Sequence, residues 1–285
     1  MCNCKRFALE ELHPRNFLFD YLYPEDFIRF QCIQSVFTYI LWRSVWAICF
    51  IFMLILNGTI SDYWTPPNYI HYQWFTYLTH WTSFLLAFVS TMDAICVIQI
   101  YLHRPDIVKG EFRQMPWYVK INWLCTTINS NLVLLVTLIH WIFVYKGERV
   151  SIFAVVTYGG TALYVTINAL ITSSPIRILH VVYPMVMVTM YAVTNFVYQE
   201  ANLANSGASP KSYPGWRTYK DILSTDLVFV VGAGVVHMYL YTLYVIRLLV
   251  ARAWCTNNRT FIYWQPLESC NTIRQDVRYT YLTAS

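Results

Sequence analysis

Six long apolar blocks alternate with polar segments along the chain, at about residues 36–57, 74–102, 119–145, 151–173, 178–199 and 223–250. A bilayer core about 30 Å thick needs about 20 apolar residues in a helix, and lipid offers no partner for a free backbone group. All six blocks reach that length, the fourth only marginally. The pattern therefore predicts an all-α protein built as a polytopic transmembrane bundle of about six helices.

The same pattern divides the chain into an N-terminal segment (1–35), a six-helix transmembrane domain (36–250) and a C-terminal tail (251–285). The first apolar block follows a polar segment, so we expect no cleavable signal peptide. Only 12% of the residues are charged, against roughly a quarter in a soluble domain. The net charge of +5 comes from residues between the blocks, so it does not indicate nucleic-acid binding.

Lysine and arginine are distributed unequally between the two sets of loops. Cytoplasmic loops retain positive charge, and one set of loops and ends carries thirteen basic residues: Lys5, Arg6, Arg15, Arg29, Arg104, Lys109, Arg113, Lys120, Arg177, Arg252, Arg259, Arg274 and Arg278. The other set carries five, namely Lys146, Arg149, Lys211, Arg217 and Lys220. Both termini are therefore expected in the cytosol.

The eight cysteines imply no disulfide framework, because none lies in a loop assigned to the exterior. Cys2 and Cys4 stand beside basic residues, which leaves S-acylation and reduced cytosolic thiols both open. Asn57-Gly58-Thr59 is a glycosylation sequon close to the membrane, and its use is also open. No phosphate-binding glycine loop, serine-hydrolase elbow or zinc-binding spacing is present, so we expect neither a metal nor a cofactor.

Ionisable side chains inside the apolar blocks are the candidate site residues, because at membrane depth they are expected to face a bundle interior or cavity. Polar residues recur at steps of three and four in five blocks, so each block carries them on one face. These faces include Thr79, Asp93, His140, Asn168, His180, Asp226 and His237.

Close packing and hydrogen bonds between helices explain most of the Ser, Thr and Asn positions. For Asp93 and His237, a pocket or catalytic role and a structural hydrogen bond are equally open. Asp226 and Arg43 are expected close enough to a membrane face to be partly wet, and Arg247 is expected to extend its charged head to the interface.

The segment from Ile167 to Tyr198 resembles the rolling stone family, multi-pass membrane proteins named for myoblast fusion. The resemblance depends mainly on five residues, Pro175, Arg177, His180, Tyr183 and Pro184, with support from the segment Phe75–Trp81. It implies a plasma-membrane protein that acts in cell–cell fusion or adhesion during muscle development.

More distantly, the chain resembles the androgen-induced membrane proteins, six-helix hydrolases of lipid esters that use a threonine nucleophile and a histidine. Their threonine follows an aromatic-leucine pair, as Thr79 follows Tyr77-Leu78. The position of their histidine corresponds to about Tyr158, so His140 or His237 would have to supply the base in a hydrolase.

Three functions remain open from the sequence. The first is a rolling stone-type fusion or adhesion protein, and the second is a lipid-ester hydrolase with Thr79, His140 and His237 as catalytic candidates. The third is a transporter or lipid-binding module, for which the binding candidates are Asp93, Asn168, His180 and Asp226. The expected partner is the lipid bilayer, with a lipid ligand as an open alternative and no nucleic acid. The sequence does not identify protein partners.

Overall fold

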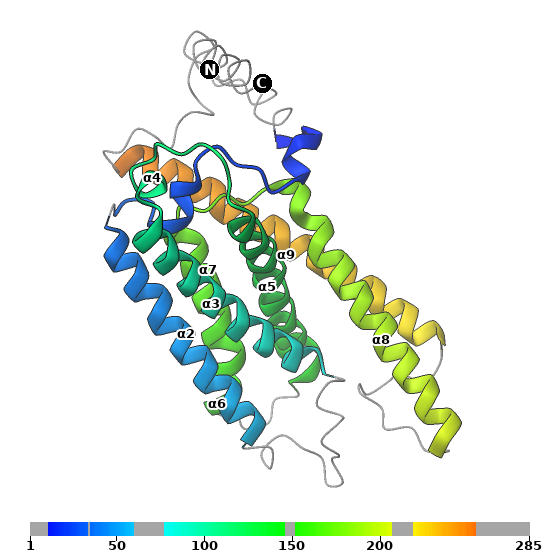
Figure 1. The fold of residues 1–285 in the computed structure, drawn as a ribbon. Helices are drawn as coiled ribbons and strands as arrows, with labels where there is room; N and C mark the ends of the chain where they lie inside the picture. Colours follow the sequence, from blue (N-terminus) through cyan, green and yellow to red (C-terminus); the bar gives the residue numbers. More distant parts are fainter. Residues whose placement is uncertain (1–10, 34, 60–76, 146–151, 207–218, 255–285) are drawn as a thin grey trace.

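The computed structural model describes residues 11–33, 35–59, 77–145, 152–206 and 219–254 (Figure 1). Six helical spans in it are long and apolar enough to cross a membrane: Val36–Thr59, Leu78–His103, Trp117–Phe143, Ile152–Ile171, Ile178–Val197 and Leu227–Ala251. Within these residues, β-structure is limited to one isolated bridge between Phe30 and Thr172. The prediction of an all-α, six-helix transmembrane bundle is confirmed.

The spans are built from the long helices of the chain, some of which are joined end to end by shorter helical turns. The first two are α2 (Val36–Thr59) and α3 (Leu78–His103). The third is α5 (Trp117–Ile139), continued by the π-helix η5 (His140–Val144). The fourth joins α6 (Ile152–Ala154), the π-helix η6 (Val155–Gly160) and α7 (Thr161–Ile171). The fifth joins η7 (Ile178–Val181) to α8 (Val182–Ser206), and the sixth lies in α9 (Tyr219–Trp254). Short helices outside the spans are η1 (Pro14–Phe17), η2 (Pro24–Ile28) and α4 (Pro105–Val108).

Helix α5 is the centre of the bundle, because it packs against α3, α7, α8 and α9. Helix α2 packs against α3 at one side, while α8 and α9 pack together at the other (Figure 1). Gly232 lets α9 approach α5 closely, since a Cβ there would lie 2.8 Å from Cδ1 of Leu135. Small residues at such crossings are what helices in lipid use to approach one another.

The outward faces of the spans are apolar. Large side chains such as Phe37, Ile48, Leu163 and Val235 are more than half exposed. In water so much exposed apolar surface would promote association, whereas hydrocarbon covers it without cost. Hydrocarbon is therefore the solvent that this surface fits.

The segment before α2 packs across one end of the bundle. Glu11 and Arg177 form a buried ion pair with Nη1 and Oε1 2.8 Å apart, and the backbone N–H of Gln31 donates to the carbonyl of Ile171 at 2.8 Å. In Figure 1 this dark blue segment and the orange end of α9 lie at the same end of the bundle. The two described ends of the chain therefore lie on one side.

Several sequence expectations concern residues outside the described ranges. Among them are acylation at Cys2 and Cys4, the basic residues Lys146, Arg149, Lys211 and Arg217, and most of the C-terminal tail 251–285. Cys32 is disulfide-bonded, which the sequence analysis did not anticipate. Cys49, Cys96 and Cys125 are free.

Candidate functional site

A buried ion pair joins α2 to α3 in the middle of the bundle. Nη1 of Arg43 lies 3.0 Å from Oδ2 of Asp93, and the amide of Asn122 on α5 donates to the other carboxylate oxygen. The residues are at most 7% exposed. The carboxylate of Asp93 is thus neutralised and hydrogen-bonded inside the membrane, as an ionisable group at this depth requires.

The guanidinium of Arg43 has further partners on two helices. It donates to the hydroxyl of Tyr39 one turn earlier on α2, and to Oδ1 of Asn168 at 3.0 Å and the hydroxyl of Tyr164 at 3.4 Å, both on α7. The prediction that Arg43 is partly wet is wrong, because it is 4% exposed. Two of the four predicted binding residues, Asp93 and Asn168, belong to this one network.

A second polar cluster surrounds a cavity of about 20 Å³ between α3, α5 and the fourth span. The hydroxyl of Thr79 lies 3.4 Å from the hydroxyl of Tyr158. The Tyr158 ring stacks on the His140 ring with centroids 3.7 Å apart and planes 13° apart. Two of the three residues lie in π-helical turns, Tyr158 in η6 and His140 in η5. Such turns are frequent at functional sites.

The geometry brings Thr79 and His140 into one cluster but links them through Tyr158. The 3.4 Å separation of the two hydroxyls exceeds the usual range of about 2.5–3.0 Å for a hydrogen bond between hydroxyls, and the contact of His140 with Tyr158 is ring to ring. Thr137 fixes the arrangement, since its hydroxyl donates to the carbonyl of Tyr158 at 3.0 Å. The cluster therefore contains a hydroxyl that could act as a nucleophile, on Thr79, and an imidazole, on His140, with the phenol ring of Tyr158 between them.

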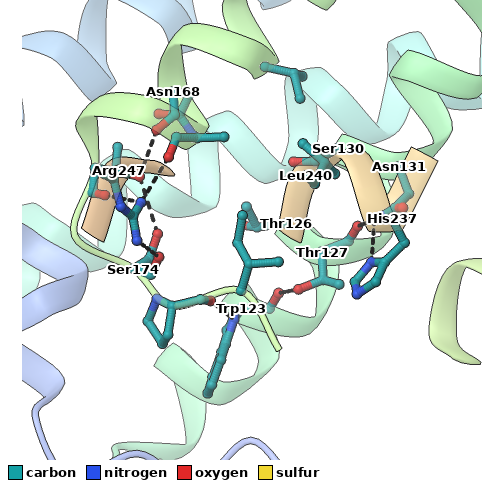
Figure 2. Close-up of a pocket in the computed structure, with 15 residues that line it drawn as sticks. Trp123, Thr126, Thr127, Ser130, Asn131, Asn168, Ser174, His237, Leu240 and Arg247 are labelled. Carbon is teal, nitrogen blue, oxygen red and sulfur yellow. Dashed lines mark hydrogen bonds between the residues drawn. The ribbon is translucent and has the colours of Figure 1, made fainter. Parts of the chain in front are cut away.

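A third polar cluster surrounds a larger cavity of about 50 Å³ between α5, α7, α9 and the loop after α7. Figure 2 shows the lining, which includes the polar residues Thr126, Thr127, Ser130, Asn131, Asn168, Thr172, Ser174, His237 and Arg247. His237 lies here, apart from Thr79. Its Nε2 is 2.8 Å from the carbonyl oxygen of Arg177, and its Nδ1 is 3.3 Å from the amide nitrogen of Asn131. A neutral imidazole that donates from Nε2 and accepts at Nδ1 satisfies both contacts.

Arg247 closes the other end of this cavity and caps α7. Its guanidinium donates to the carbonyls of Ala169 at 2.9 Å, of Ser174 at 2.8 Å and of Thr172. Ala169 lies in the last turn of α7, where carbonyls are left without a partner in the helix, Thr172 is its C-cap residue, and Ser174 lies in the loop that follows. Arg247 is 3% exposed, so the prediction that its head reaches the interface is wrong. The C-terminus of α7 holds the side chain inside the bundle instead.

The remaining predicted binding residues are His180 and Asp226. His180 is fully buried, and its ring packs against those of Phe19, Trp123 and Tyr183 with centroids 4.3, 5.0 and 5.6 Å away. It therefore lies under the N-terminal segment rather than in either cavity. Asp226 lies in α9, but its side chain is outside the part of the chain that the structure describes.

Sequence reasoning missed Asn122, Tyr164 and Tyr39. A signal for them exists in the spacing, because Asn122 extends the polar face of Thr126 and Ser130 back by one turn. Tyr39 and Arg43 are four residues apart, as are Tyr164 and Asn168. Such pairs share one helix face.

Comparisons with known proteins agree with this architecture. The model of the family described as Protein rolling stone matches residues 2–266. Protein rolling stone of Drosophila melanogaster is 24% identical over 214 residues, which cover 68% of this chain and 72% of the fly protein. No solved structure matches. Together with the six spans, the match over nearly the whole chain shows that this multi-pass membrane protein belongs to the rolling stone family.

Proposed function

We propose that this protein acts at the plasma membrane in cell–cell fusion or adhesion during muscle development. The observation that carries the proposal is the family match over residues 2–266, since the family takes its name from myoblast fusion. The bundle suits such a role, because its polar groups are paired inside and its outer faces are apolar. A protein of this kind can present its outer loops to another cell without performing chemistry.

A cell-mixing assay tests this role. Two cell populations carry complementary halves of a fluorescent protein, and the full chain is expressed in one or both. We expect fluorescence from mixed cells to rise above that of cells without the chain. Thr79→Val should support the same rise, because fusion does not require the Thr79 hydroxyl. No rise at a verified surface level would contradict the proposal.

The proposal places both termini in the cytosol. The count of basic residues supports this side, and the described ends of the chain lie together. Epitope tags at the two ends should become accessible to antibodies only after the cells are permeabilised. Labelling of intact cells would reverse the assignment.

A lipid-ester hydrolase is the second candidate, and the contact between Thr79 and Tyr158 favours it. The nearest described imidazole in that cluster is His140, stacked on Tyr158. The cavity of about 20 Å³ has room for about one or two waters, so a substrate would require the helices to separate.

Turnover of a fatty-acid ester by the purified full chain tests the hydrolase. Thr79→Val should abolish turnover, and His140→Ala should do so if its imidazole is the base. Thr91→Val is the matched control, because the Thr91 hydroxyl on the same helix donates only to the carbonyl of Ala87. Turnover that survives Thr79→Val would exclude this mechanism.

The third candidate, a transporter or lipid-binding module built around Asp93, has less support from the geometry. The Asp93 carboxylate is bonded to Arg43 and Asn122, and it lines neither of the cavities of 20 and 50 Å³. Of the predicted binding residues, Asn168 lines the larger cavity.

A further inference from the structure

The charge of Arg247 is only partly balanced inside the bundle. Its guanidinium has no carboxylate within 4.0 Å among the described residues, whose ion pairs involve Arg29, Arg43, Arg104, Lys120 and Arg177. Its bonds go to three carbonyls at the C-terminus of α7. A helix C-terminus supplies roughly half a negative charge. Its Cζ also lies 5.0 Å from the centroid of the Tyr244 ring, which adds a weaker cation–π contact. No full counter-charge therefore faces Arg247 in a region where unpaired charge is costly.

Unused hydrogen-bonding atoms lie around the same cavity. Nε of Arg247 is buried without a partner, and so is the hydroxyl of Thr126, which faces the cavity from α5. An N–H and an O–H donor together with residual positive charge form the arrangement that binds an anion. Arg43 differs in this respect, because Asp93 already neutralises it.

The size and depth of the cavity limit what kind of anion fits. A buried water needs roughly 10–15 Å³ by this measure, so about 50 Å³ accommodates three to five heavy atoms. A carboxylate with its first carbons has that size, and it carries a single charge. Arg247 stands four residues before the end of the apolar span at Ala251, about 6 Å inside it. An amphiphile with an alkyl chain can place its head group at this depth, whereas a hydrophilic anion without a chain would have to leave water completely.

Part of the cavity lining is apolar. Val165, Ile176 and Leu240 line the cavity, and His237 lies ten residues before Arg247 on α9, at the other end of the lining in Figure 2. At the opposite side, Trp123 is covered by rings of the N-terminal segment, including Phe19 and Phe27. The N-terminal segment therefore covers this side of the cavity.

We propose that the cavity lined by Arg247 and Thr126 binds the carboxylate of a fatty acid. The guanidinium of Arg247 and the Thr126 hydroxyl donate to the carboxylate oxygens, while the alkyl chain leaves toward the lipid. This site is separate from the Thr79 cluster and does not depend on the proposed role in fusion.

Binding of radiolabelled oleate to the full chain in detergent tests the site. We expect saturable binding that unlabelled oleate displaces and that oleyl alcohol, with the same chain and no charge, does not. Butyrate, which has the carboxylate without the long chain, should displace the label only weakly. If butyrate displaced the label as effectively as oleate does, the cavity would bind a carboxylate, but the proposal that this carboxylate belongs to a fatty acid would be overturned.

Thr126→Val separates binding from folding, because it removes the unpartnered hydroxyl without touching the cap of α7. A hydrogen bond to a charged group is worth enough that affinity for oleate should fall about tenfold. Thr242→Val is the matched control, since Thr242 is exposed on α9 and bonds only to the carbonyl of Met238; its affinity should not change. Arg247→Lys keeps the charge at the site and should retain measurable binding.

Three outcomes would overturn the proposal. The first is that unlabelled oleyl alcohol displaces the radiolabelled oleate as effectively as unlabelled oleate does, because binding would then depend on the apolar chain alone. The second is that Thr126→Val binds like the wild type. The third is that no saturable binding occurs to protein that elutes as a single species, in which case the cavity holds water only.

Discussion

Neutralising Asp93 should destabilise the bundle strongly. In Asp93→Asn the side chain keeps its shape and its contact with Asn122, but Arg43 loses the carboxylate 3.0 Å from its Nη1. The remaining partners of Arg43 are the neutral groups of Tyr39, Tyr164 and Asn168. Removing one partner of a buried pair costs about 3–5 kcal/mol, because the other charge stays buried without compensation.

The matched control is Asp106→Asn, which breaks an exposed pair. Nη2 of Arg104 lies 2.8 Å from Oδ2 of Asp106, with both side chains about one third exposed. Water solvates the charges of such pairs, so their loss costs about 0–1 kcal/mol. The two variants make the same chemical change, one at a buried ion pair inside the bundle and the other at an exposed ion pair outside the spans.

The measurement is the free energy of unfolding of the full chain in detergent, for Asp93→Asn, Arg43→Met and the double variant. Each single change should cost several kcal/mol, whereas the double change should cost less than their sum, because it leaves neither charge unpaired. The reasoning is refuted if Asp93→Asn is no more destabilising than Asp106→Asn. Strict additivity of the two single changes would also refute it.

Three further predictions concern other parts of the molecule. Asn57 should remain unglycosylated, because its side chain is 7% exposed; N-glycosidase should leave the mobility of the expressed chain unchanged. Gly232→Leu should lower the free energy of unfolding by about 1–3 kcal/mol, because the added side chain overpacks against Leu135. Gly58→Ala, where a Cβ meets open space, should raise the free energy of unfolding by up to about 1 kcal/mol; thermal unfolding measures both. Burial raises the pKa of the Glu25 carboxyl above its usual value of 4.5. The contribution of Glu25 to stability is therefore complete below pH 4.5 and is lost as the pH rises through the pKa of the folded state. Proteolysis of the N-terminal segment should become faster over the same rise in pH, and Glu25→Gln should remove this pH dependence.

The spans and their inward faces could be predicted because both follow from local chemistry. A run of 20 apolar residues has one stable state in lipid, and a polar residue at every third or fourth position marks one face. The buried positions of Ser90 and Asp93 on α3 agree with that spacing.

The partners across helices could not be predicted in the same way. The spacing of residues within α2 does not predict whether Arg43 forms an ion pair with Asp93 or faces water, because that depends on how α2 is rotated relative to α3. Arg177 was counted as a loop charge, yet it pairs with Glu11, 166 residues earlier. The π-helical turn that carries His140 has no proline or glycine to mark it, whereas Gly159 and Gly160 directly follow Tyr158 in the other.

The position of the Arg43 network explains how α2 keeps its orientation. Among the helices, α2 packs mainly against α3, and apolar side chains alone would hold it weakly, because lipid is as apolar as leucine. Through Asp93, Asn122 and Asn168 the charge of Arg43 is bonded to α3, α5 and α7. Any rotation of α2 would separate a cation from its counter-charge in hydrocarbon, whereas a small slide of apolar contacts would cost little. The ion pair therefore specifies the register of α2, which is the best-attested use of buried charge in a fold.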